Sequence, residues 1–453
     1  MTLQDLLLVL VLPGLVGALL SALLTHRLRK RVRLWRAVAA ELGLQEVQGE
    51  GAFTTFSLTG RLGTRGLRFQ HHEEKYEPAG TLLAVGGDSG VSLRREDMAA
   101  LFHKGFVERE LQVGDAEFDH RVYLRGDPAV LRAVLDAETR GLVLRLLGGH
   151  TLSGQLAGEV VSGDVRAWVS DRDFGSVEKL TQVVREVLAL ARRLDRPADV
   201  LGRLAENLKT EPEWRVRLQD VLLLAEASVS HPAAREALKR ACGGEQGEVR
   251  LQAALGLREE GRETLLEIAG AESEDDSRRA KAVAGLGDLL TVERGLELLA
   301  SSLRRRHVQA ARACLESLGR SRDLAVVEPL ARVLAVEKGE LAVVAAQALG
   351  ATRRAGAESP LLQALRGVSS AVRVAAAEAL GRVGSVAAVL PLKKVAETQP
   401  GELGRAARQA FAAIQSRLPG ATPGQLSLAE GEAGRLSLAG EDPAGRVSLA
   451  GQD

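Results

Sequence analysis

Cysteine, aromatic residues and excess charge are all scarce in this chain of 453 residues. Two cysteines argue against a disulfide scaffold and are typical of a protein in a reducing compartment. A net charge of +1 creates no overall field that would attract nucleic acid, so we expect no nucleic-acid partner. Hydrophobic residues make up 45% of the chain and charged residues 26%, which suits two or three folded domains.

Motifs that carry catalysis or metal binding are also scarce. The only dense cluster of metal-capable side chains is His71-His72-Glu73-Glu74, and adjacent residues of a strand point to opposite faces, so His71 and His72 cannot share one ion. The glycine-rich run Val85–Gly90 lacks the Lys-Ser/Thr of a phosphate loop, and the folded part contains no nucleophile elbow. We therefore assign no catalytic, metal-binding or cofactor-binding residue and expect the protein not to be an enzyme.

A helical repeat occupies the C-terminal half of the chain. In Ala371–Thr398, Ala and Leu recur at three- and four-residue steps, a Gly break follows, and a second apolar segment begins; this pattern predicts two helices joined by a turn. Similar hairpins recur every 29 to 34 residues. Their first helices close on Leu224, Leu257, Leu286, Leu318, Leu349, Leu380 and Ile414. Repetition with this period predicts an α-solenoid, in which each hairpin packs against the next.

Small residues and prolines recur with the hairpins. Alanine at the packed positions allows neighbouring helices to approach closely. Pro329, Pro360 and Pro391 are spaced 31 residues apart, and we expect each to lie where a second helix starts. With the motif VRVAAAEALGRVG at residues 372–384, this part resembles HEAT repeats, especially the short bacterial PBS-lyase-like form. The resemblance covers about 201–418 and implies a helical solenoid without specifying an activity.

The one long uncharged apolar run is Leu6–Leu24. Its 19 residues are long enough to cross the ~30 Å hydrocarbon core of a bilayer as a helix. A cleaved signal peptide is the alternative, but it would need positive charge before the run and a small-residue cleavage site after it. Asp5 precedes the run and Thr25-His26-Arg27 follows it. We therefore predict an uncleaved transmembrane anchor within residues 1–25.

A basic juxtamembrane segment, residues 26–36, follows the predicted anchor. Its basic residues are Arg27, Arg29, Lys30, Arg31, Arg33 and Arg36, with no acid before Glu41. Because such a flank stays on the cytoplasmic side, we predict a single-pass protein of the inner (cytoplasmic) membrane, with the N-terminus outside and the bulk of the chain cytoplasmic. These side chains either bind anionic lipid headgroups or only stop translocation.

Residues 37–200 differ in composition from the repeats. Eleven of the chain's thirteen aromatic residues fall between Trp35 and Phe174. Strand-like runs occur at 53–58, 66–71, 81–85, 121–124 and 166–169, with helical patterns at 95–103, 128–147 and 176–194. This irregular mixture predicts a compact α+β domain. Its segment Val113–Asp127 resembles a motif of membrane-tethered bacterial domains of unknown function, which implies an anchored accessory domain and transfers no activity.

Residues 419–453 form a tail rich in Gly, Ser, Ala and acidic residues, for which we predict disorder. The tail contains three near-copies of a GxxSLA motif, centred on Ser427, Ser437 and Ser448. Each copy alternates apolar and polar residues like a strand. One interpretation is a trivalent peptide ligand that adds strands to partner sheets. The other is a tolerated product of replication slippage.

Together these features predict an α-solenoid of HEAT-like helical hairpins, a smaller α+β domain and one N-terminal transmembrane helix. We expect a non-catalytic, membrane-tethered scaffold that binds protein partners through the solenoid. Candidate partner-binding residues on or beside the second helices are Arg235, Arg332, Arg366, Lys393 and Lys394. The alternatives are a HEAT-type enzyme, such as a metal-dependent hydroxylase or a lyase, and a ligand sensor that acts through the α+β domain. The sequence does not specify an oligomeric state.

Overall fold

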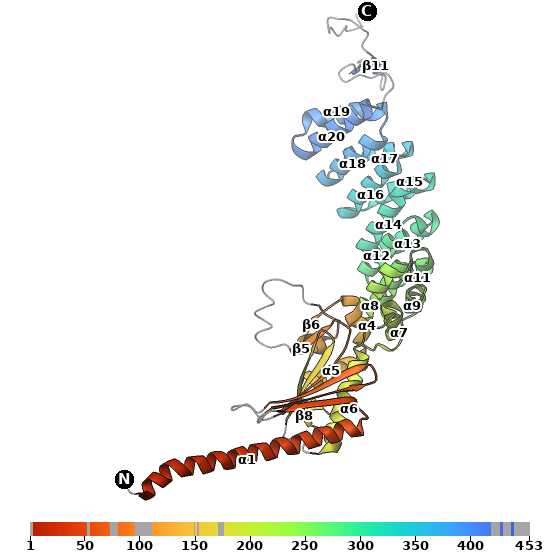
Figure 1. The fold of residues 1–453 in the computed structure, drawn as a ribbon. Helices are drawn as coiled ribbons and strands as arrows, with labels where there is room; N and C mark the ends of the chain where they lie inside the picture. The colour runs from red at the N-terminus through yellow and green to blue at the C-terminus, as the bar shows by residue number, and fades with distance from the viewer. Residues whose placement is uncertain are drawn as a thin grey trace, which may run out of the picture. The chain divides into compact units, whose positions relative to one another are not determined.

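The computed structural model describes residues 3–51, 55–72, 80–95, 111–148, 150–151, 154–170, 176–417, 426–428 and 436–438. Side chains within some of these ranges, including those of residues 3–14, lie outside the description. Contacts divide the chain into two compact units, Met1–Ala241 and Cys242–Asp453. Each unit is described separately below (Figure 1).

The first unit begins with one continuous helix, α1 (Leu3–Glu41). The predicted anchor, the basic segment and the start of the predicted α+β domain all lie on this helix. Its last turns enter the core, where Trp35 is fully buried and its Nε1 donates to Thr81 Oγ1 at 3.0 Å. Among the described residues, no helix combines the length and apolar character needed to span a membrane. Much of the predicted span Leu6–Leu24 falls on residues whose side chains are not described.

A nine-stranded sheet forms the centre of the first unit. The strands are β1 (Gln45–Gly51), β2 (Thr55–Leu62), β3 (Arg65–His72), β4 (Gly80–Val85), β5 (Ser92–Arg95), β6 (Val122–Arg125), β7 (His150–Thr151), β8 (Gly154–Val161) and β9 (Asp164–Ser170). They run antiparallel in the order β1-β2-β3-β4-β9-β8-β5-β6, and β7 pairs with β8. The predicted strand-like runs coincide with β2, β3, β4, β6 and β9, whereas β1, β5 and β8 were not predicted.

Helices cover one face of this sheet. They are the end of α1, α3 (Ala116–Arg121), α4 (Pro128–Val134), α5 (Ala137–Leu147) and α6 (Val177–Arg193). The pattern of α6 explains its position, because its buried residues recur at three- and four-residue steps and Ser176 caps its N-terminus. The predicted helix 128–147 is two helices, since Asp136 accepts a hydrogen bond from the Thr139 amide and starts α5.

Three further helices complete the first unit: α7 (Val200–Thr210), α8 (Trp214–Ala227) and α9 (Pro232–Cys242). The sequence suggested that the solenoid starts at residue 201, because Leu224 in α8 fits the repeat spacing. The division between the compact units falls between Ala241 and Cys242, so α7 and α8 are described with the first unit. Packing of α7 against α4 and of α8 against α7 gives these helices partners within the first unit.

The second unit is a series of helical hairpins (Figure 1). Its helices are α10 (Gly247–Leu257), α11 (Arg262–Gly270), α12 (Asp276–Leu286), α13 (Val292–Arg305), α14 (Val308–Arg320), α15 (Val327–Val336), α16 (Glu340–Thr352), α17 (Glu358–Leu365), α18 (Ser370–Val383), α19 (Val386–Thr398) and α20 (Gly401–Gln415). The six predicted anchor residues in this unit, from Leu257 to Ile414, are all buried. The predicted paired helices and their shared core are thus confirmed here.

Successive first helices of the hairpins touch backbone to backbone. A Cβ placed on Gly319 would lie 2.8 Å from Ala348 Cα, one on Gly350 2.7 Å from Ala379 Cα, and one on Gly381 3.0 Å from Ala410 Cα. These Gly–Ala contacts therefore join α14 to α16, α16 to α18 and α18 to α20. The expectation that small residues permit close helix packing is confirmed, with glycine supplying the closest contacts.

The prolines of the second helices differ in position. Pro329 and Pro360 lie in the first turns of α15 and α17, as expected. Pro391 instead lies inside α19, five residues after its start. The turns before α15 and α17 are short 3-10 helices, whereas α19 is α-helical from Val386. The Ser385 hydroxyl caps α19, and the Ser385 amide also donates to Glu358 Oε1 at 2.8 Å, which stabilises this earlier start.

Two copies of the tail motif pair with one another. β10 (Leu426–Leu428) and β11 (Leu436–Leu438) are antiparallel, with Ser427 opposite Ser437. The third copy, which contains Ser448, lies outside the described residues, as does most of the tail. Disorder of the tail therefore stays a prediction.

Candidate interaction sites

The basic residues of α1 do not share one environment. Five of them are exposed: Arg27, Arg29, Lys30, Arg33 and Arg36. Arg31 is only 6% exposed, because the helical period aligns it with Trp35 and Val38, which pack into the core of the first unit. Arg31 therefore belongs to the folded domain rather than to the exposed basic face.

The described part of the predicted anchor carries an apolar surface. Leu15, Val16, Leu19, Leu20 and Leu23 are each at least half exposed along α1. Isolated exposed leucines are common on protein surfaces, whereas these residues form an exposed apolar run on one helical segment.

The predicted partner-binding residues separate into two groups. Arg332, Arg366, Lys393 and Lys394 are exposed on or beside α15, α17 and α19 in the second unit. Arg235 lies in the first unit on α9, where its Nε donates to the Ser228 carbonyl at 3.2 Å and so stabilises the preceding turn.

Exposed apolar side chains accompany the basic residues of the second helices. Val336 at the end of α15 and Leu390 in α19 are both more than half exposed. The sequence analysis did not identify these residues. Their exposure could have been predicted from the sequence, because each lies off the buried stripe of its helix.

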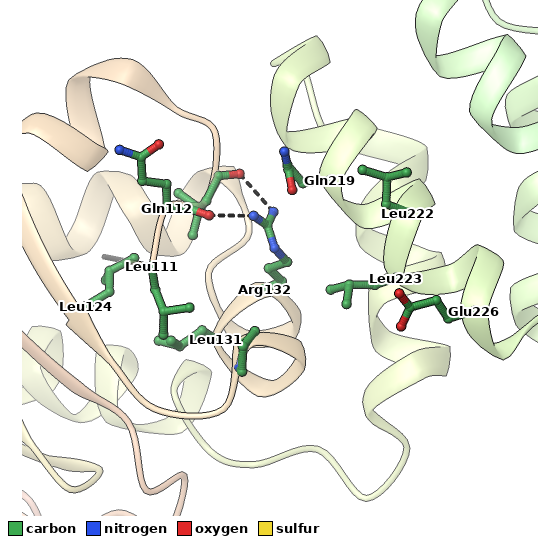
Figure 2. Close-up of a pocket in the computed structure, with 11 residues that line it drawn as sticks. Leu111, Gln112, Leu124, Leu131, Arg132, Gln219, Leu222, Leu223 and Glu226 are labelled. Atoms are coloured by element: carbon green, nitrogen blue, oxygen red, sulfur yellow. Dashed lines mark hydrogen bonds between the residues drawn. The ribbon is translucent and has the colours of Figure 1, made fainter. Parts of the chain in front are cut away.

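A cleft of about 330 Å³ lies inside the first unit, between α8 and the segment before α3 (Figure 2). Leu111, Leu124, Leu131, Leu222 and Leu223 provide most of its apolar wall. At one edge the guanidinium of Arg132 donates to the carbonyls of Gln112 and Val113 and faces Gln219 of α8. These bonds fix the edge of the cleft, so its shape depends on Arg132.

A buried ionic cluster lies beside this cleft. Arg140 is centred in it: its two Nη atoms donate to Glu211 at 3.0 and 2.8 Å, and its Nε donates to Asp115 at 2.9 Å. The Arg140 and Glu211 side chains are 3% and 2% exposed. Because these residues lie on α5, before α3 and after α7, the cluster ties the α7–α8 hairpin to the α+β domain. The sequence analysis did not identify the cluster, since its members are far apart in the chain.

Asp220 of α8 is a second buried carboxyl of this region. Its Oδ1 lies 3.4 Å from Arg132 Nη1. Burial raises the pKa of Asp220 to about 7, and the charge of Arg132 and its hydrogen bond oppose this rise only in part. Asp220 therefore titrates near neutral pH, whereas an ordinary aspartate titrates near pH 3.9.

This raised pKa predicts a pH dependence of stability. Between about pH 4 and pH 7 the folded state binds the Asp220 proton and the unfolded state does not, so this contribution to stability falls as the pH rises through 7. The unmodified protein should lose up to about 2.7 kcal/mol of unfolding free energy between pH 5 and pH 8, because about two pH units of this window lie below the raised pKa. We expect the Asp220→Asn variant to lack this decrease. Urea unfolding at several pH values measures the unfolding free energy of each protein. The exposed Asp288→Asn variant is the control, and equal slopes in all three proteins would contradict the assignment.

The predicted metal-capable cluster is only partly described. His71 is buried; its Nδ1 lies 3.3 Å from Thr81 Oγ1, and its ring stacks on Phe56. The side chain of His72 and residues Glu73 and Glu74 lie outside the description. Among the residues that are described, no three potential metal ligands come together.

Comparison with known proteins gives one positive result. The family model of HEAT repeats matches residues 327–412, which run from α15 into α20. A search of curated proteins finds no match to the chain. The match and the stacked hairpins together support a HEAT-repeat protein, and HEAT repeats are consistent with a protein-interaction scaffold.

Proposed function

We propose that the protein is a non-catalytic scaffold, tethered to a membrane by α1, that binds a protein partner through its HEAT repeats. The observation that carries this proposal is the exposed surface of the second helices. Basic side chains at Arg332, Lys393 and Lys394 lie there with the exposed apolar Leu390 and Val336. Arg332 pairs with Glu328 at 2.9 Å, but both side chains are exposed, so the pair is weak. Cationic and apolar groups that share the exposed faces of α15 and α19 fit a partner with an acidic, partly apolar surface.

The tether is supported by the apolar surface of α1 and the exposed basic face that follows it. Residues such as Leu19 and Leu23 have no described protein surface over them. Arg27, Arg29, Lys30, Arg33 and Arg36 begin just beyond them. This order favours a single-pass protein of the inner membrane, with the N-terminus outside and the repeats in the cytoplasm.

One experiment tests both parts of the proposal. Chemical crosslinking is performed in membranes that carry the full chain, followed by an alkaline wash. The test variant is Arg332→Glu, Lys393→Glu and Lys394→Glu; the control makes the same charge change on first helices with Arg320→Glu, Arg382→Glu and Arg405→Glu. We expect the test variant to lose about tenfold in crosslinked partner, because like charges repel across an interface, and the control to lose little.

Each half of this experiment can fail by itself. All three proteins should stay in the washed membrane pellet. Release of the unmodified chain into the wash would contradict the tether. Equal partner yields from the test and control variants would contradict binding through the second helices.

A further inference from the structure

A hollow of about 710 Å³ lies in the first unit, and several of the described residues that line it are basic. Arg95, His120, Arg121 and Arg145 line it, together with the apolar residues Val122, Leu144 and Leu147. No carboxylate is present among its described lining residues. Three arginines and a histidine therefore line a hollow whose described wall contains no carboxylate.

The fold explains how residues so distant in sequence meet. Arg95 ends β5 and lies directly opposite Val122 of β6. His120 and Arg121 are in the last turn of α3, immediately before β6, and Arg145 is in the last turn of α5. Two helix ends and one strand end thus bring their basic residues to one edge of the sheet.

Existing ion pairs leave most of this charge available. Arg121 pairs with Glu117 at 3.2 Å, but both side chains are largely exposed, so the pair is weak and screened by water. The neighbouring Arg94 is not among the described lining residues and pairs with Glu159 at 3.5 Å. Within the described residues, the structure shows no carboxylate paired with Arg95 or Arg145.

We propose that this hollow binds a phosphate group attached to an apolar organic moiety. Planar guanidinium groups bind phosphate oxygens in pairs, and several of them favour a doubly charged anion over a single carboxylate. The hollow is much larger than inorganic phosphate, and Leu144 and Leu147 provide an apolar wall for the attached group. A soluble phosphorylated compound and a phospholipid headgroup share this chemistry. The site goes beyond the scaffold function, which does not require it.

The test measures thermal unfolding of the full chain in nonionic detergent, with phenyl phosphate as the probe. Inorganic phosphate and sodium chloride, each at the same ionic strength, serve as comparisons. We expect phenyl phosphate to raise the unfolding midpoint most, because bound ligand stabilises the folded state. In the Arg95→Gln, Arg145→Gln double variant, the affinity for phenyl phosphate should fall about tenfold for each guanidinium removed. The Arg125→Gln variant, an exposed arginine on β6 outside the hollow, should respond like the unmodified chain.

The two ligand sources are separated by a second arm. Micelles are supplied with either phosphatidic acid or phosphatidylcholine. A lipid headgroup would be identified if phosphatidic acid raised the unfolding midpoint much more than phenyl phosphate and if this rise required Arg95 and Arg145. A soluble ligand would be identified if phenyl phosphate gave the larger rise. An equal response of all variants to every anion would overturn the proposal. Since Arg95 and Arg145 are exposed, we expect the double variant without ligand to unfold at the unmodified temperature.

Discussion

The Arg140→Met variant is expected to lose about 3–5 kcal/mol of unfolding free energy, the typical cost of removing one partner from a buried ion pair. In the folded protein Arg140 donates to both carboxylate oxygens of Glu211, to Asp115 and to the Leu135 carbonyl at 3.0 Å. Methionine fills a similar volume but offers no donor. Glu211 would then be a carboxylate buried without its guanidinium, and the α7–α8 hairpin would lose its main polar attachment.

Two further variants separate this ionic effect from a loss of packing. Arg145→Met changes an exposed arginine on the same helix and should leave stability within about 0.5 kcal/mol. Adding Glu211→Leu to Arg140→Met should recover part of the loss, because replacing both buried charges by apolar groups removes the unpaired carboxylate. Chemical denaturation of the full chain measures all three. If the double variant were as unstable as Arg140→Met, the buried charge would not be the cause.

The Gly350→Val variant is expected to destabilise the second unit by about 3 kcal/mol, at the upper end for an overpacked contact. A Cβ at Gly350 would lie 2.6 Å from Ala379 Cβ and 2.7 Å from its Cα. The neighbour is a main-chain atom of α18, so no side-chain rotation relieves the clash and the two helices must separate. Limited proteolysis should therefore cut between α16 and α18 faster than in the unmodified chain.

The matched control for this variant is Gly356→Val. Gly356 lies in the 3-10 turn before α17, and an added Cβ there meets only Val327 Cγ1, at 3.5 Å. We expect little change in stability or proteolysis. If Gly350→Val unfolded at the same denaturant concentration as this control, the backbone contact between first helices would not stabilise the unit.

Local repetition explains what could be predicted from the sequence. The hairpins of the second unit were predictable because each repeats the same apolar spacing. Leu318, Leu349 and Leu380 occupy the same position in successive hairpins, so each strengthens the prediction for the others. Strand β8 (Gly154–Val161) was missed because its two glycines and lack of aromatic residues conceal its alternation. It forms in the structure because β9 and β5 pair with it on either side.

The sites were less predictable because they depend on pairings across long stretches of chain. Arg140 and Glu211 are separated by 71 residues, and neither has a local motif that indicates its partner. Arg95, Arg121 and Arg145 likewise come together only through the sheet register and the ends of α3 and α5. Arg31 was grouped with its basic neighbours, since the charge run gave no sign that the helix continues into a folded core.

The unbroken course of α1 has a mechanical consequence for the proposed tether. A continuous helix that runs from a bilayer into a domain core fixes the orientation of the domain as well as its position, whereas a flexible linker fixes neither. Each residue added between Thr25 and Arg31 would turn the domain by about 100° around the helix axis and raise it by about 1.5 Å. In the proposed tether, the spacing of this short stretch would therefore set which side of the α+β domain is presented to the lipid surface.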